Sequence, residues 1–208
     1  MRQRQAAFRP LVAFDFDGTL TSRDSFTAFL AWRAGSARYA AGMASLAPAA
    51  AAYLINRDRG RLKAAAVRRF LAGETRAELE AEAQTFAAEH GRALLRPDAL
   101  RAWRRWQAEG ARLVIVTASP EIVVSPIARG LGADRLIGTR LAFDANDRVT
   151  GDLEGANCRG PEKVRRLRET FGPDVALEAA YGDTDGDTEM LALAEEQGMR
   201  VFNGTGPG

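Results

Sequence analysis

The chain has 208 residues, of which 46% are apolar and 27% charged. This balance is typical of a globular protein with one domain, or one domain plus an insert. A net charge of +2 and the lack of any block of like charge argue against a nucleic-acid partner. A single cysteine, Cys158, excludes an intramolecular disulfide framework, and a single histidine, His90, excludes a multi-histidine zinc site.

The chain begins with MRQRQAAFRP, which carries charge and lacks the apolar segment of a signal peptide. We therefore expect a cytoplasmic protein. The apolar run that follows predicts a buried strand over residues 11–16. This strand belongs to the sequence FDFDGTL, which places two carboxylates, Asp15 and Asp17, one residue apart where the strand ends.

Helices are predicted from about residue 25 to residue 95, where Ala, Leu, Arg and Glu predominate. Thr75, followed by Glu78 three residues later, indicates the start of one helix, and Gly91 is its predicted end. Residues 39–55 contain no charge and are flanked by arginines. The stretch is short for a membrane span and contains Pro48. A packed helical hairpin is therefore favoured over peripheral contact with the inner face of the membrane.

After a helix at residues 97–110, the pattern alternates between strands and helices. Strands are predicted at 111–119, 134–143, 148–155, 175–183 and 199–204, and helices at 122–131, 160–172 and 187–198. This alternation is typical of parallel βαβ units. The sequence thus predicts an α/β fold with a Rossmann-like parallel sheet core, formed by residues 1–22 and 96–208. Residues 23–95 are too many for a plain crossover and are predicted to form an inserted helical cap.

Polar side chains stand at the ends of three predicted strands: Asp15 with Asp17, Thr117 with Ser119, and Asp183 with Asp185 and Asp187. The carboxyl ends of parallel strands share one edge of a sheet, so these groups are expected to meet there. Closely spaced carboxylates require a positive partner, and oxygen ligands suit Mg²⁺.

Lys163 is the candidate cation among the side chains, because it is one of only two lysines in a chain with 27 arginines. Carboxylates, a divalent ion, a hydroxyl and a lysine together indicate phosphoryl transfer. In that chemistry one aspartate attacks phosphorus and the other moves a proton.

Four motifs in order give the chain a resemblance to the haloacid dehalogenase superfamily of aspartate-nucleophile phosphohydrolases. The motifs are DFDGT, VIVTAS, Lys163 in GPEKVRRL, and YGDTDGDTEM. The resemblance implies that Asp15 is the nucleophile and Asp17 the acid/base. It implies Mg²⁺ ligands from the Asp15 carboxylate, the Asp17 carbonyl oxygen and Asp183, while Asp187 would support either the metal or Lys163. Thr117 and Lys163, with Gly18 and Ala118, would bind the phosphoryl group.

Within this superfamily the chain resembles the subgroup of phosphoserine phosphatase, which inserts a helical cap after the first strand. Gly18 stands where those enzymes usually have Ser, and Asp24 where they have Glu. The arginine-flanked stretch at residues 39–55 looks closer to phosphatidylglycerophosphatase C. We therefore expect a Mg²⁺-dependent phosphomonoester hydrolase with a small or lipid phosphate as its substrate.

Two other functions fit the sequence. One is a phosphotransferase or mutase of the same superfamily. The other is a membrane-surface binding protein whose catalytic motifs are vestigial. A structural interpretation also exists for each motif: DFDGT as an Asx turn, Thr117 as a helix cap, and Lys163 as a solvated charge. Asp183–Ala194 fits a calcium loop poorly, because Thr188 and Ala194 stand where an EF-hand needs Gly and Glu.

Overall fold

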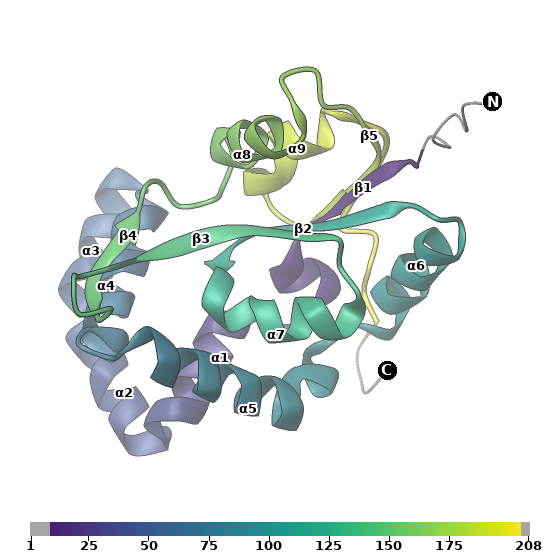
Figure 1. Cartoon of the computed structure of the whole chain (residues 1–208). Coiled ribbons are helices and arrows are strands. Elements are labelled where there is room, and N and C mark those ends of the chain that lie inside the picture. Colours follow the sequence, from purple (N-terminus) through teal and green to yellow (C-terminus); the bar gives the residue numbers. More distant parts are fainter. Residues whose placement is uncertain (1–8, 205–208) are drawn as a thin grey trace.

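The computed structural model describes residues 9–204, which are built around a six-stranded sheet (Figure 1). The strand order is β4-β3-β2-β1-β5-β6. Neighbouring strands are parallel except for β3 and β4, which form an antiparallel pair. The strands are β1 (Leu11–Phe14), β2 (Arg112–Pro120), β3 (Arg135–Phe143), β4 (Val149–Glu154), β5 (Leu177–Gly182) and β6 (Ala194–Met199). The predicted α/β class is confirmed.

Helices cover both faces of the sheet, as Figure 1 shows. Because side chains alternate along a strand, Val12 and Phe14 of β1 join one apolar cluster and Ala13 joins the other. The first cluster includes residues of α6 (Pro97–Ala108) and α7 (Glu121–Leu131), and the second includes residues of α8 (Pro161–Phe171) and α9 (Thr188–Leu191). Burial on both faces explains why the central strands are continuous apolar runs.

The chain between β1 and α6 is helical, as predicted. It forms α1 (Ser25–Ala34), α2 (Ser36–Ser45), α3 (Ala47–Asn56), α4 (Arg59–Leu71) and α5 (Arg76–Leu94). Helix α5 begins at the predicted capping box of Thr75 and Glu78. The prediction that Gly91 ends this helix is wrong. Gly91 lies within α5 against α7, where an added Cβ would come within 3.3 Å of Ile127, so its small size serves helix packing.

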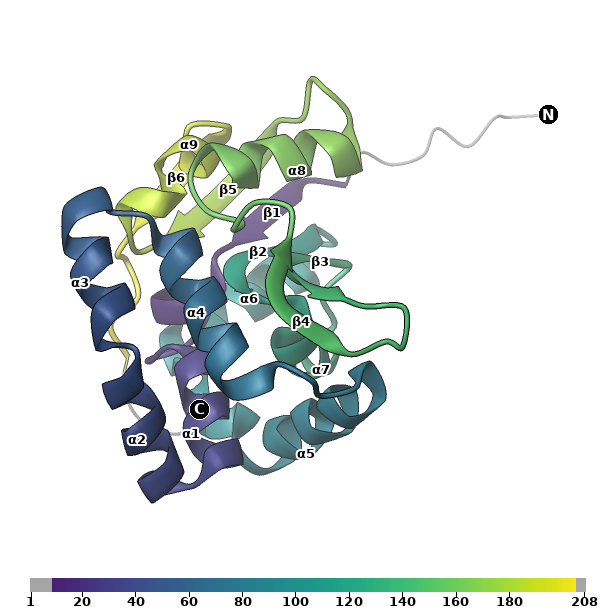
Figure 2. The ribbon, with the colours of Figure 1, turned by 90° about the vertical axis from the view of Figure 1, so that its left-hand side faces the viewer.

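Residues 39–55 do not form a hairpin, which corrects the prediction. Helices α2 and α3 follow one another up the same side of the molecule, and the chain reverses after them, between α3 and α4 (Figure 2). Pro48 lies in the first turn of α3, where its missing N–H costs no helical hydrogen bond. Within residues 9–204, no helix combines the length and the apolar character that crossing a membrane requires.

The C-terminal elements also differ from the prediction. The expected helix at 187–198 is reduced to the single turn α9, and the last strand is β6 rather than residues 199–204. Ala194–Met199 pairs with β5 in parallel. Glu195 and Glu196 are exposed in this edge strand, and the pairing with β5 overrides their helical propensity.

The capping box makes a prediction about stability. Thr75→Ala removes a hydroxyl that both accepts from the Glu78 N–H and donates to its carboxylate, so the free energy of unfolding should fall by about 1 kcal/mol. Thr85→Ala is the matched control in the middle of α5, and its change should stay within about 0.5 kcal/mol. Urea unfolding of both variants measures the difference, and equal effects would contradict the capping role.

Candidate active site

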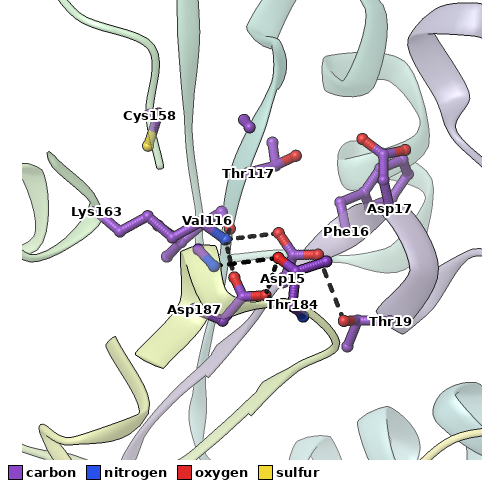
Figure 3. Close-up of polar contacts among 12 residues, drawn as sticks. Asp15, Phe16, Asp17, Thr19, Val116, Thr117, Cys158, Lys163, Thr184 and Asp187 are labelled. Atoms are coloured by element: carbon purple, nitrogen blue, oxygen red, sulfur yellow. Dashed lines mark hydrogen bonds and ion pairs between the residues drawn. The ribbon is translucent and has the colours of Figure 1, made fainter. Parts of the chain in front are cut away.

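The predicted polar residues converge at the carboxyl edge of the central strands. Asp15 follows the last residue of β1, Thr117 lies near the end of β2, and Asp183 follows β5. The Asp15 N–H donates to the Tyr181 carbonyl at 2.8 Å, which fixes the end of β1 beside β5. Figure 3 shows the side chains of Asp15, Thr117, Lys163 and Asp187 gathered at this edge. The structure therefore brings these four side chains together, whereas Asp185 lies at the surface and pairs with Arg159.

Lys163 is the buried cation at the centre of this cluster (Figure 3). It extends from the first turn of α8 and is 1% exposed. Its Nζ lies 2.6 Å from Asp15 Oδ1, from Asp187 Oδ1 and from the Val116 carbonyl oxygen. Burial alone would lower the pKa of Lys163, but the two carboxylates outweigh it and raise that pKa above its ordinary value. The lysine is therefore charged, and it is not a solvated helix residue.

Asp15 is buried beside this ammonium. Burial raises the pKa of the Asp15 carboxyl to about 7, with a further increase from Asp187 and Asp17 that Lys163 partly offsets. Thr19 Oγ1 lies 3.4 Å from the second oxygen, Asp15 Oδ2. One oxygen of Asp15 thus faces Lys163 and the other faces a hydroxyl, which orients the carboxylate.

Asp187 anchors the other side of Lys163. Its second oxygen accepts hydrogen bonds from the N–H groups of Asp183 and Thr184, at 3.2 and 3.0 Å. Burial would raise the pKa of Asp187, but Lys163 and these N–H donors outweigh it and lower that pKa. Asp187 is thereby held as an anion, and its contact with Lys163 agrees with the supporting position predicted for it.

The acidic set at this edge fits a divalent cation. Asp15, Asp183 and Asp187 each offer an oxygen within 4.8 Å of the others. Three carboxylates face one ammonium, so the cluster has excess negative charge for a hard cation such as Mg²⁺. Gly18, with φ of +82°, leaves room for this set, because an added Cβ would lie 2.1 Å from Asp183 Oδ2. A side chain at position 18 would therefore displace Asp183.

Asp17 lies apart from the Lys163 cluster, as Figure 3 shows. Its carboxylate accepts hydrogen bonds from the Ser25 N–H, at 2.6 Å, and from the Ser119 hydroxyl. Burial and the charge of Asp24 raise the pKa of the Asp17 carboxyl, against the effect of the two serine donors. Asp15 and Asp17 therefore have separate side-chain partners.

Thr117 and Ala118 line a cavity of about 680 Å³ that also contains Asp15, Gly18 and Lys163 on its wall. The Thr117 hydroxyl accepts from the Ser119 N–H at 3.0 Å, so it is held in place at the strand end. All eight residues that the sequence singled out for the site, including Asp17, Asp183 and Asp187, line this one cavity.

Comparison with known proteins agrees with this geometry. The sequence model of the haloacid dehalogenase-like hydrolase family matches residues 12–192. The chain belongs to that family.

Similar proteins place this family member near phosphatases. The chain is 62% identical over 194 residues to protein CicA of Caulobacter vibrioides, covering 93% of this chain and 87% of that protein. It is 31% identical over 190 residues to phosphoserine phosphatase of Halobacterium salinarum, covering 88% and 82%. A solved phospho-aspartyl intermediate analogue of phosphoserine phosphatase has the same fold, with a TM-score of 0.60, 22% identity, and coverage of 91% and 85%. The predictions of this superfamily, of its fold and of a phosphatase are confirmed.

One residue of the cavity in this haloacid dehalogenase-like hydrolase escaped the sequence analysis. Lys63 of α4 reaches across to the core, where its Nζ donates to the Ala118 carbonyl. Burial lowers the pKa of Lys63, and the charges of Asp17 and Asp24 partly oppose this. The available signal was that Lys63 is the only lysine besides Lys163. Lys63 stands in a predicted helix 55 residues before Ala118, and nothing in the sequence indicated that the two residues are in contact.

Breaking the central ion cluster should destabilise the protein. Lys163→Met leaves two buried carboxylates without their cation, so the free energy of unfolding at neutral pH should fall by about 3–5 kcal/mol. The loss should shrink on acidification, because the freed carboxyls can then take up protons. Arg165→Met, on the exposed side of the same helix, is the control and should leave the free energy of unfolding nearly unchanged. Equal losses in chemical denaturation would contradict a special role for Lys163.

Proposed function

We propose that this phosphatase is a Mg²⁺-dependent phosphomonoester hydrolase that works through an aspartyl phosphate on Asp15. The observation that carries the proposal is the buried, oriented Asp15 carboxylate. It is fixed by Lys163, lines an open cavity and adjoins two further carboxylates. A phosphate ester entering this cavity meets a nucleophile, cations and a separately placed acid.

In the first step an oxygen of Asp15 attacks phosphorus, and the bond from phosphorus to the alcohol oxygen breaks. Asp17 gives its proton to that leaving oxygen, and its raised pKa favours the protonated form that this requires. Ser119 and Ser25 hold the Asp17 carboxyl in place for the transfer. The products are the free alcohol and an acyl phosphate on Asp15.

In the second step Asp17 takes a proton from a water molecule, and the water oxygen attacks phosphorus. The bond between phosphorus and Asp15 breaks, which releases inorganic phosphate and restores the Asp15 carboxylate. Lys163 and the Thr117 hydroxyl, with the backbone of Gly18 and Ala118, would bind the phosphoryl oxygens throughout. Asp187 would keep Lys163 in position.

The donors for Mg²⁺ would be the carboxylates of Asp15 and Asp183 and the carbonyl oxygen of Asp17. When bound, the ion offsets negative charge on the transferring phosphoryl group. The excess of carboxylates over ammonium groups in the cluster supports this assignment.

We further propose that residues 23–95 act as a cap over a core of residues 1–22 and 96–208, in a cytoplasmic protein. Peripheral contact with a membrane through residues 39–55 has some support, because Leu54 and Ile55 at the end of α3 are 66% and 87% exposed. Arginines at positions 57, 59 and 61 follow directly and would suit an anionic surface.

Removal of the nucleophile is the decisive test of the mechanism. Asp15→Asn should lower kcat for release of phosphate from p-nitrophenyl phosphate by at least about 10³-fold, because the amide cannot form the acyl phosphate. Asp152→Asn, on the exposed side of β4, is the control and should keep full activity. Retained turnover in the Asp15 variant would contradict the proposal. Phosphate transfer to an added alcohol in preference to water would instead identify a phosphotransferase.

Metal binding can be tested without turnover. Mg²⁺ should raise the Tm of the protein, and a concentration 100 times the Kd should stabilise it by about 2.7 kcal/mol. Asp183→Asn should abolish most of this rise, while Asp152→Asn should retain it. A Tm that does not respond to Mg²⁺ in the unaltered protein would contradict the metal assignment.

A further inference from the structure

The cavity beside Asp15 extends well beyond the space that a phosphoryl group needs. Its volume of about 680 Å³ lies within the range of about 300–1,000 Å³ for small-molecule sites. One end contains the carboxylates, Thr117 and Lys163, and residues of helices α1 to α4 line most of the rest, where Met43, Ala47 and Ala50 remain exposed. The lining of that helical part indicates what the remainder of a substrate looks like.

The uncharged stretch of the sequence supplies one wall of this part. Six of its residues line the cavity. Apart from one adjacent pair, they follow one another at intervals of three or four residues, which places them on one face of a helical segment. They are Tyr39, Met43, Leu46, Ala47, Ala50 and Tyr53. The uncharged stretch at residues 39–55 therefore presents one apolar face to the cavity.

The opposite wall is apolar as well. Phe26 and Leu30 of α1 and Leu62 and Ala66 of α4 line the cavity across from the stripe on α2 and α3. We call these ten apolar residues of α1 to α4 the apolar chamber. None of the ten carries a charge, but two cations of the cavity wall lie over their rings: Arg59 is 5.9 Å from the centre of the Tyr53 ring and Lys63 Nζ is 6.0 Å from the centre of the Phe26 ring. The other cations of the wall are Arg23, Arg159 and Lys163. Lys63 and Lys163 contact the backbone of β2 beside Thr117, at the phosphoryl end.

This separation of charge from apolar surface matches an amphiphilic molecule. We infer that the substrate is a phosphomonoester of an alcohol with a long alkyl chain or an apolar ring, which occupies the apolar chamber while its phosphate faces Asp15. The inference rests on the proposed function. A zwitterionic alcohol such as that of phosphoserine would bury its ammonium and carboxylate groups against apolar walls at a cost. Asp24 also lines the cavity, and its Oδ1 accepts the α1 cap hydrogen bond from the Thr27 N–H at 2.6 Å.

A series of soluble alkyl phosphates tests the inference. Ethyl, butyl, hexyl and octyl phosphate are compared below their micellar concentrations, with phosphoserine as a polar ester close in size to butyl phosphate. Burial of each added methylene should raise kcat/KM about fourfold until the apolar chamber is full. Phosphoserine should be a poorer substrate than butyl phosphate. A kcat/KM that is independent of chain length overturns the inference.

A pair of substitutions locates the effect. Ala50 lines the apolar chamber and its neighbour Ala51 does not, although both are exposed residues of α3. Ala50→Phe should bring kcat/KM for octyl phosphate down toward that for ethyl phosphate, and Ala51→Phe should keep the full ratio between the two. Circular dichroism and thermal unfolding verify that both variants fold. The same loss in both variants, or in neither, overturns the inference.

Two outcomes separate this inference from the proposed function. Hydrolysis of p-nitrophenyl phosphate without a chain-length preference overturns the apolar chamber alone. If no ester releases phosphate, the proposed function fails. The affinity of the protein for the same alkyl phosphates, measured by calorimetry, then tests the inference. Affinity that rises with chain length supports it, and equal affinity overturns it. A final experiment uses vesicles that contain phosphatidic acid. Release of phosphate from these vesicles identifies a bilayer lipid as the substrate. Release of phosphate from the soluble esters alone identifies a soluble amphiphile.

Discussion

The site depends on one buried ammonium group. Lys163 holds Asp15 and Asp187 from the first turn of α8, and its third contact is the backbone of β2. These contacts tie together four segments that are far apart in the sequence. A buried charge is costly without partners, and the two carboxylates compensate it only at short distance. The short distances that stabilise the cluster therefore also fix the orientation of the Asp15 carboxylate.

The two aspartates of the first motif are separated by the fold in a way that suits different roles. Asp15 faces the ammonium and the acidic set, while Asp17 faces neutral donors from α1 and β2. An anion is favoured beside a cation, and a buried carboxyl without one retains its proton more readily. The proposed nucleophile and the proposed proton donor can thus be close together in the sequence without sharing a side-chain partner.

The helices between β1 and α6 connect the site to the question of substrate. Their inner faces are apolar, and Lys63 extends from them to the backbone next to Thr117. In the proposed function, the core would supply groups for a phosphate, and the helices would supply a surface for the rest of the substrate. The family match covers residues 12–192, which include both the core site and α1 to α4.

The sequence by itself determined the α/β class, most of the helices and strands, and the residues that converge on the site. It could do so because apolar runs and their polar ends are local patterns, and because the edge where parallel strands end follows from the fold class. It did not give the partners of Asp17, the position of Lys63 or the course of α2 and α3, since each depends on contacts between distant segments. It also misplaced β6, where pairing with β5 overrides the helical propensity of AEEQ. Tertiary structure alone decided that the uncharged stretch lines a cavity, because one face of a helix acquires its surroundings only when other helices pack around it.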